Sequence, residues 1–236
     1  MKVRNKKKII CIIALISYIF SGCASYHSIR QAPLSTNPIA QQNKRINDDI
    51  ESMVYPITTQ SMQKQIFDND LIEKGYLPVQ ISILNKKDCN VTFNKDGIVL
   101  LTPEEIVIPR TSNLKVAMDT DKSIGRTVGW TVGFGVIGLI PSAMNVSKTN
   151  KRIQADYVAK APIEGNLIPG GLVDGILFFK LPEEKIETLN DYKMNIVLRD
   201  EIKNEDINIT HTLYGDIEYE GDEEDAEQEA KEEDDL

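Results

Sequence analysis

The chain has 236 residues, 41 % of them hydrophobic, and a formal net charge of −9, which is enough apolar material for one globular domain. Most of the negative charge lies at the C-terminus, since residues 216–236 contain 13 acidic residues and one lysine. Residues 23–215 are close to neutral, with a net charge of −2. A basic surface for binding nucleic acid is therefore not expected.

The N-terminus has the pattern of an export signal. Five basic residues among the first eight precede an uncharged run from Ile9 to Gly22, and a basic start before a short apolar core is typical of a secretory signal peptide. The run is shorter than the roughly 20 apolar residues that a membrane-spanning helix needs. Ser21, Gly22 and Cys23 resemble the bacterial lipoprotein signal, although Phe20 stands where leucine is usual.

This resemblance implies that residues 1–22 are a signal peptide that is removed and that Cys23 is acylated. The acylated Cys23 would bind membrane lipid and place the rest of the chain outside the cytoplasm, in the cell envelope. Ala24 and Ser25 lack the aspartate that often retains lipoproteins in the inner membrane. An outer-membrane location is therefore favoured if the cell has two membranes. An uncleaved anchor and an ordinary secretory signal are the alternatives.

Two segments connect the signal to the expected domain. Residues 23–45 are polar, include two prolines and show no periodicity, which predicts a flexible tether. In residues 46–75 the apolar side chains recur loosely at helical spacing, so we predict one or two short helices. Pro56 is expected to interrupt them, because proline breaks the helical hydrogen-bond pattern.

From residue 76 the hydrophobic pattern changes to a period of two, as Leu77, Val79 and Ile81 show. Seven or eight short strands over residues 76–215, separated by turn residues, predict an antiparallel sandwich. Segments 77–85 and 168–179 resemble immunoglobulin-like domains of bacterial envelope lipoproteins. The predicted class is mainly β with helical additions: an antiparallel immunoglobulin-like sandwich, an inserted helical hairpin and short N-terminal helices.

Beyond the sandwich, residues 216–236 are expected to form an acidic disordered tail. Their like charges repel one another. After Tyr219 no residue in this segment is suited to a hydrophobic core, so too little apolar surface is buried to order the chain.

A glycine-rich insertion, residues 112–160, interrupts the strand pattern. Residues 127–147 carry no charge, and glycines recur every four residues before and within them. These glycines share one helix face, where another backbone can approach closely. They are Gly125, Gly129 and Gly133, and the bulky residues Trp130 and Phe134 lie on a different face. Pro141 is expected to kink or end this helix. A second helix, from Ser142 or Asn145 to about Lys160, would complete a helical hairpin.

Three interpretations of this hairpin stay open. It packs on the sandwich or on itself, its glycine face mediates self-association or docking onto another envelope protein, or it enters a membrane. Packing within the folded protein is favoured. Five glycines, two threonines and Pro141 make the segment less apolar than most membrane spans.

The sequence carries no catalytic signature. Its two histidines, His27 and His211, have no metal or relay spacing, and no nucleophile turn or phosphate loop is present. Beyond Cys23 only Cys89 remains, so no internal disulfide is expected. We therefore expect a non-enzymatic envelope lipoprotein with a structural or interaction role and no cofactor or metal. The alternative is an accessory subunit of an envelope secretion or transport assembly.

Overall fold

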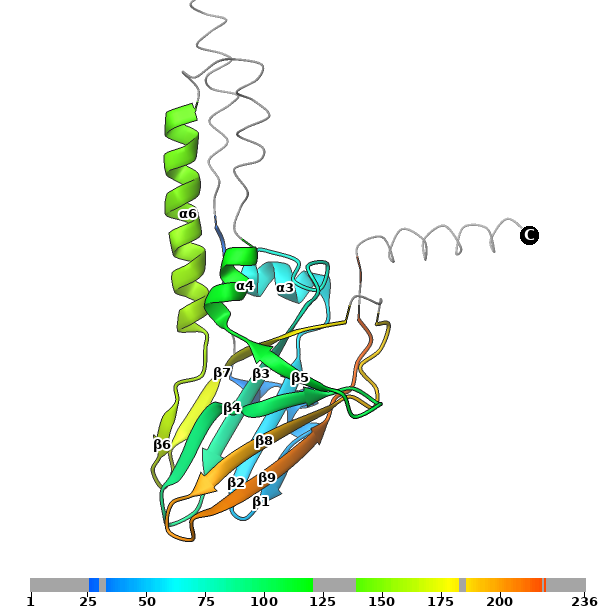
Figure 1. The fold of residues 1–236 in the computed structure, drawn as a ribbon, viewed down its shortest axis with the longest axis vertical. Coiled ribbons are helices and arrows are strands. Elements are labelled where there is room, and N and C mark those ends of the chain that lie inside the picture. Colours follow the sequence, from blue (N-terminus) through cyan, green and yellow to red (C-terminus); the bar gives the residue numbers. More distant parts are fainter. Residues whose placement is uncertain (1–25, 30–32, 121–138, 183–185, 218, 220–236) are drawn as a thin grey trace, which may run out of the picture. The chain divides into compact units, whose positions relative to one another are not determined.

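The computed structural model describes residues 26–29, 33–120, 139–182, 186–217 and 219 (Figure 1). The described residues from 27 to 120 and from 153 to 219 belong to one compact unit, which we call the β domain. Its strands are β1 (Arg45–Asn47), β2 (Ile50–Pro56), β3 (Tyr76–Asn85), β4 (Val91–Leu101), β5 (Val107–Thr111), β6 (Gly165–Leu167), β7 (Leu172–Lys180), β8 (Lys193–Asp200) and β9 (Glu205–Thr212).

Helices precede these strands and connect some of them. They are the 3-10 turn η1 (Leu34–Thr36), α2 (Pro38–Gln42), α3 (Gln60–Phe67), α4 (Asn113–Asp119) and α6 (Leu139–Ala159). Only the last turns of α6, from Ile153, belong to the β domain. Among the helices that the structure describes, none combines the length and apolar character needed to cross a bilayer.

The strands pair antiparallel in the order β1-β2-β3-β7-β5-β4-β8-β9, with β6 pairing β4. Strand β5 joins the two halves of this arrangement, because Pro109 pairs with β4 while Arg110 and Thr111 pair with β7. The ends of the order approach each other, since the side-chain amide of Asn47 on β1 donates to the Asn208 carbonyl on β9 at 2.8 Å. The sheet is thus nearly closed and barrel-like.

The mainly β, antiparallel prediction is confirmed, but the immunoglobulin-like sandwich is not. A sandwich has two separate sheets, whereas here β5 makes one continuous path through all the strands of that order. The two strands predicted at 91–93 and 97–101 are also one strand, β4, with a register irregularity between Phe93 and Ile98. Such irregularities sharpen the bend of a strand and help a sheet to close.

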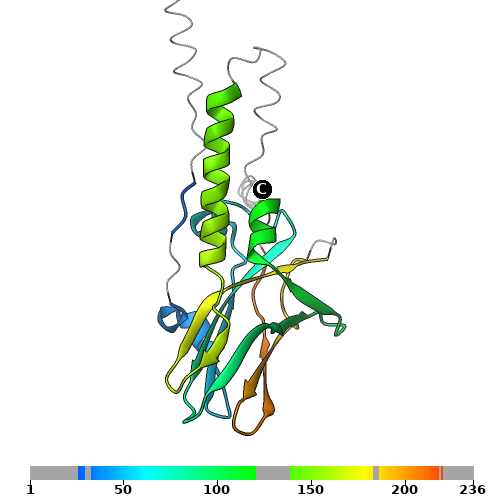
Figure 2. The same ribbon diagram turned by 60° about the vertical axis from the view of Figure 1, so that its left-hand side comes forward.

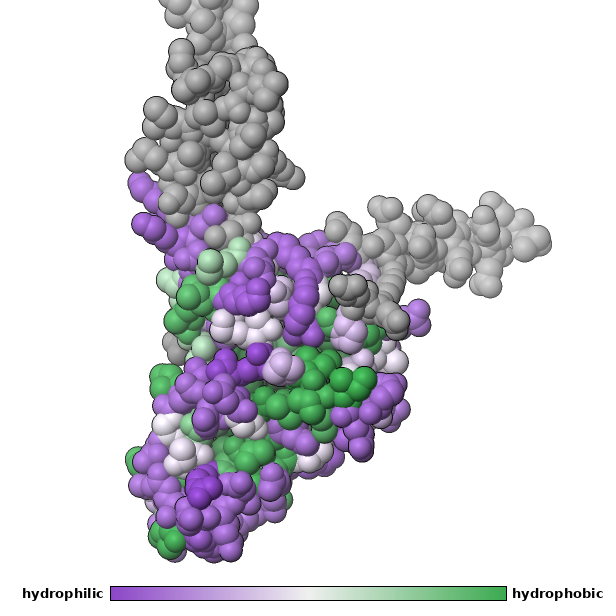
Figure 3. Space-filling model, in the orientation of Figure 1, coloured by the Kyte–Doolittle hydropathy of each residue, from purple (hydrophilic) through white to green (hydrophobic). Residues whose placement is uncertain are grey.

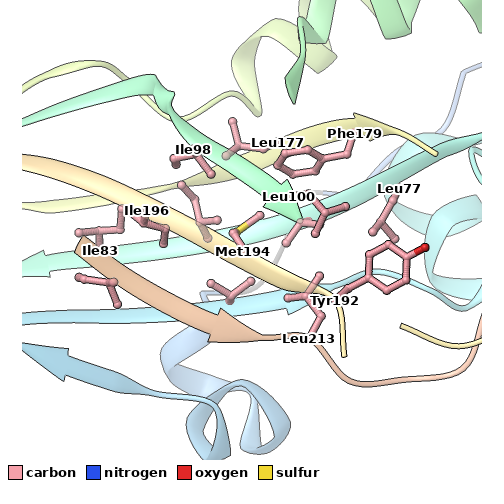
Figure 4. Close-up of a cluster of buried hydrophobic side chains, with 14 of the residues drawn as sticks. Leu77, Ile83, Ile98, Leu100, Leu177, Phe179, Tyr192, Met194, Ile196 and Leu213 are labelled. Carbon is pink, nitrogen blue, oxygen red and sulfur yellow. The ribbon is translucent and has the colours of Figure 1, made fainter. Parts of the chain in front are cut away.

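Alternating side chains from the strands fill the interior (Figure 4). The labelled residues point toward one another from β3, β4, β7, β8 and the residues just before β8 and after β9, and all are at most 7 % exposed. Each fully buried aliphatic or aromatic side chain contributes roughly 1.5–3 kcal/mol relative to an exposed one. They are Leu77, Ile83, Ile98, Leu100, Leu177, Phe179, Tyr192, Met194, Ile196 and Leu213.

The helical prediction for residues 46–75 is wrong in its first half, which forms the hairpin of β1 and β2. Asp48 and Asp49 have φ values of 47° and 57°, the left-handed conformation that two-residue hairpin turns need. Strand β2 is buried on both faces, since Val54 faces the core and Met53 packs on Leu34 and Ala40 outside it. The period-two signal is therefore lost. In the second half, α3 confirms a short helix.

The folded domain also begins earlier and ends later in the sequence than predicted. Within the predicted tether, the side chain of Asn37 accepts hydrogen bonds from two backbone N–H groups of α2, and Leu34 and Ala40 are buried. At the other edge, Ile217 is buried and the Tyr219 hydroxyl donates to the Ile186 carbonyl at 3.0 Å. The ordered domain thus extends into both predicted flexible segments, and residues 220–236 lie outside the described part of the chain.

The insertion leaves and re-enters the β domain through α4 and α6. The prediction of a break at Pro141 and a start at Ser142 or Asn145 is wrong, because α6 already includes Leu139 to Pro141. Proline is tolerated in the first turn of a helix, where its missing N–H breaks no helical hydrogen bond. The helix ends close to the predicted boundary at Lys160. Residues 121–138, where the first helix of the predicted hairpin falls, lie outside the described residues. The structure therefore establishes the two helical ends of the insertion.

Gly175 is where the chain returning from α6 crosses β7. A Cβ atom at this position would lie 2.3 Å from the Pro162 backbone nitrogen and 2.7 Å from its Cα. The Ile176 N–H donates to the Lys160 carbonyl at 2.8 Å beside it. Only glycine allows this backbone approach, so the position holds the base of the insertion against the strand.

We expect Gly175→Ala to lower the free energy of unfolding by about 1–3 kcal/mol, because overpacking forces the backbone to shift. Asp174→Ala is the matched control, since Asp174 is exposed on the same strand. Urea titration followed by far-UV circular dichroism measures both. Equal stability of the two variants would contradict the proposed close approach.

Candidate functional site

Three groups of residues in the β domain are candidates for a functional site. Two are clusters of buried polar side chains, and the third is the place where three helices meet. A seam cluster joins β2 to β9, a turn cluster lies among the loops at one end, and a base gathers α3, α4 and the end of α6 at the other end. Figure 2 shows the base and the turns at opposite ends of the strands.

The seam cluster consists of Ser52, His211 and the backbone carbonyl of Asn43. The His211 Nε2 lies 2.8 Å from the Ser52 Oγ, and its Nδ1 lies 3.2 Å from the Asn43 oxygen. A carbonyl can only accept, so Nδ1 carries the proton and Nε2 accepts from the serine hydroxyl. Burial, and then the charge of Arg45, lower the pKa of His211 to about 4.

This arrangement places a serine hydroxyl against a neutral imidazole, as in nucleophilic hydrolases. However, Ser52 is fully buried and His211 is 1 % exposed, so no substrate reaches the hydroxyl in this structure. The pair instead satisfies two polar groups inside the nearly closed sheet, where an unpartnered one costs about 1–3 kcal/mol. Its role here is to fasten β9 to β2 and to the chain before β1.

The turn cluster is centred on the buried ammonium group of Lys87. It pairs with Asp48 in the β1–β2 turn and, at 3.1 Å, with Asp200 at the start of the β8–β9 turn. The backbone N–H groups of Ile202 and Lys203 each donate to Asp200 at 2.9 Å. These N–H groups, together with Lys87, lower the pKa of the Asp200 carboxyl to about 2.

Cys89 lies beside this ion pair, with its sulfur 3.7 Å from an Asp200 oxygen. Burial, and then the Asp200 charge, raise the pKa of the thiol, so Cys89 stays protonated at neutral pH and is a poor nucleophile. The cavity among these turns has a volume of about 260 Å³ and is lined by charges that are largely paired with one another. In the part of the chain that the structure describes, no three acidic, histidine or cysteine side chains are placed to hold a metal ion.

The base joins the insertion to the β domain through the buried side chain of Asn113 at the start of α4. Its amide nitrogen donates to the Tyr157 carbonyl of α6 at 2.9 Å and to the Ile176 carbonyl of β7 at 3.1 Å. At the other end of α4, the Tyr76 hydroxyl donates to Asp119, and the Asn69 amide donates to the Thr120 carbonyl at 3.1 Å. Both ends of the helix are therefore fixed.

An aromatic cluster completes the base. The rings of Tyr157 on α6 and Phe178 on β7 stack with centroids 5.6 Å apart, and Phe67 of α3 lies 5.4 Å from Tyr157. Aromatic pairs at such distances contribute about 0.5–1.5 kcal/mol beyond the burial of their area. The backbone N–H of Ile29 also donates to the Gln65 carbonyl of α3 at 3.0 Å. The N-terminal segment thus reaches the domain at the same end as the insertion.

Most of the residues named from the sequence lie outside the part of the chain that the structure describes. Cys23, Gly125, Gly129, Trp130, Gly133 and Phe134 all lie in residues that the structure does not describe. His27 is exposed, whereas His211 is buried at the seam. The seam and turn clusters were missed because their members are far apart in sequence. Ser52 and His211 are separated by 159 residues and no motif joins them.

No family model matches the sequence, and neither does any curated protein. Among solved structures, the chain is similar to the yjhA protein from Bacillus subtilis, with 13 % identity and a TM-score of 0.35 over 78 % of this chain and 96 % of that one. A functionally unknown protein from Listeria monocytogenes EGD-e gives 13 % identity and a TM-score of 0.30 over 72 % and 80 %. Likenesses this distant carry no argument about function.

His211 predicts an acid-sensitive stability. Its pKa is about 4 in the folded state and near 6.5 when unfolded, so the unfolded state binds the extra proton first and stability falls as pH drops between these values. We expect a loss of about 3 kcal/mol from pH 7 to pH 4 that is absent in His211→Gln. Urea titrations across this range test it, with the exposed His27→Gln as control. The same slope in His211→Gln as in the wild type would contradict this assignment.

Proposed function

We propose that this protein is a non-enzymatic lipoprotein of the bacterial cell envelope, anchored through an acylated Cys23, with a structural or interaction role. The β domain is the rigid support, and the glycine-rich insertion is the part that meets a partner. In a cell with two membranes the outer membrane is the favoured location. The export signal supports the lipid anchor, and the base of the domain supports an interaction role for the insertion.

The observation that carries the proposal is the convergence at the base. The N-terminal segment reaches α3 at Ile29, and the insertion leaves the domain at Thr120 and returns at Ile153, beside the aromatic cluster. Hydrogen bonds of Asn113 with the Tyr157 carbonyl and of Asp119 with Tyr76 hold both ends of the insertion. A simple connection between two strands does not require such contacts. Fixed ends limit the motion of a segment and lower the entropy lost when a partner binds it.

The polar clusters favour a support over a catalyst. The charges of the turn cluster are largely paired with one another, and the seam serine and histidine are enclosed by the sheet. Each cluster joins chain segments that are distant in sequence, which is what a rigid scaffold requires. An accessory subunit of a secretion or transport assembly, using the same insertion to oligomerise or enter a membrane, is the second candidate, favoured by the regular spacing of Gly125, Gly129 and Gly133.

The anchor is tested by Cys23→Ser, which removes the proposed acylation site. We expect the variant to incorporate no radiolabelled palmitate and to leave the membrane fraction, because the attached fatty chains supply the membrane affinity. Cys89→Ser is the matched control, since that thiol is buried in the β domain, and it should keep its label. Equal labelling of Cys23→Ser and the wild type would overturn the anchor.

The partner-binding role of the insertion is tested by Gly129→Leu combined with Gly133→Leu. Bulky side chains on the glycine face should abolish chemical cross-links to a second copy or to another envelope protein, because close backbone approach is blocked. Thr131→Leu lies off that face and is the control. Cross-linking in intact cells, with thermal unfolding of the purified variants, gives the readout. A folded double variant with unchanged cross-links would contradict the role, and unfolding of a monomer would favour packing within the protein.

A further inference from the structure

Helix α4 carries two exposed apolar side chains at the base. Leu114 and Met118 are 47 % and 58 % exposed, and four residues apart they lie on one side of the helix. Val116 and Ala117 on the opposite side are buried. Lys115 is exposed as well, and its ammonium group lies 3.2 Å from Asp119. The outer side of α4 is therefore apolar with a long cationic side chain next to it.

The N-terminal chain limits how far this helix can lie from the anchor. Ile29 is fixed to α3 by its backbone hydrogen bond to Gln65, and α4 is tied to the chain after α3 by the hydrogen bond from Asn69 to Thr120. Ile29 is the sixth residue after Cys23, and six residues span at most about 20 Å. A lipid on Cys23 would hold the base within that distance of the bilayer.

The turn cluster lies at the other end of the strands. Strand β3 begins at Tyr76, which is bonded to Asp119 of α4, and ends at Asn85, whose side chain holds the loop of the turn cluster. Its ten residues span about 33 Å, which exceeds the reach of the N-terminal segment. Because the chain from Cys23 to Ile29 is shorter than this strand, the base, and not the turn cluster, is the end of the domain nearest to the membrane.

We propose that the base rests on the lipid headgroups of the membrane that holds Cys23, with Leu114 and Met118 inserted and Lys115 among the phosphates. Apolar side chains of surface helices enter the boundary between headgroups and acyl chains, while lysines extend back to the polar layer. This inference rests on the proposed function, since it needs the acylated Cys23. The inference also gives the orientation of the domain, with the turn cluster pointing away from the membrane.

A second apolar surface offers the main competing orientation. Figure 3 shows a hydrophobic area on the side of the molecule where β4 and β5 lie. Ile106, just before β5, and Val107, its first residue, are 62 % and 56 % exposed. If this side lay on the membrane, the domain would be tipped over. A fluorophore on β5 therefore distinguishes the two orientations.

The test uses the acylated, full-length mature protein with Cys89→Ser, reconstituted into vesicles of phosphatidylethanolamine and phosphatidylglycerol. Single cysteines at Met118→Cys, Val107→Cys or Ile202→Cys carry an environment-sensitive fluorophore, and Ile202 is 78 % exposed in the far turn. Lipids with a nitroxide near the headgroup quench only nearby fluorophores. We expect roughly a twofold or larger loss of emission at position 118 and little at 107 and 202.

Each outcome decides between the orientations. Strong quenching at position 107 would show a domain lying on its side, and no quenching at any position would show a domain held off the surface. Either result overturns the inference while leaving the anchor intact, provided that the protein floats with the vesicles. Failure to float would overturn the proposed function itself. If Met118→Cys does not fold by circular dichroism, Leu114→Cys replaces it on the same helix face.

Discussion

The side-chain amide of Asn113 is the interaction on which the base of this protein depends. It is buried between α6 and β7 and donates one hydrogen bond to each of them. Loss of this group would leave two buried carbonyls without a donor, each at a cost of about 1–3 kcal/mol. Without this contact, the first and last helices of the insertion would lack this direct hydrogen-bonded link to each other. Asn113 joins its first helix, its last helix and the strand beneath into one unit.

The two ends of the β domain are built on different physics. At the turn end, the buried Lys87 is held between Asp48 and Asp200, so three loops are fixed by charge. At the base, Phe67, Tyr157 and Phe178 fix helices to a strand by aromatic packing. Buried ion pairs therefore hold one end of the domain together, and buried aromatic packing holds the other.

Much of the strand content was predictable, because a period-two pattern such as Ile207 to His211 survives where one face is buried and the other is not. Strand β3 is buried on both faces but still alternates, because polar side chains such as Gln80 and Ser82 lie between its core residues. The hairpin of β1 and β2 was not predictable on this basis. Strand β2 is covered on both faces, by the core and by Leu34 and Ala40, so its residues no longer alternate. Its turn is made by two aspartates at positive φ, a pair that signals a hairpin less strongly than Asn-Gly or Asp-Gly.

By itself the sequence determined the mainly β class and the glycine spacing of the insertion, and it predicts an export signal with Cys23, because each is a local pattern along the chain. Only the tertiary structure decided that β5 joins the two halves of the sheet, that Ser52 meets His211 and that Lys87 meets Asp200. The last two pairs join residues more than 100 positions apart, and local patterns carry no information about such distant partners. The base likewise exists only in the fold, where Ile29, Asn113 and Tyr157 are brought to one end.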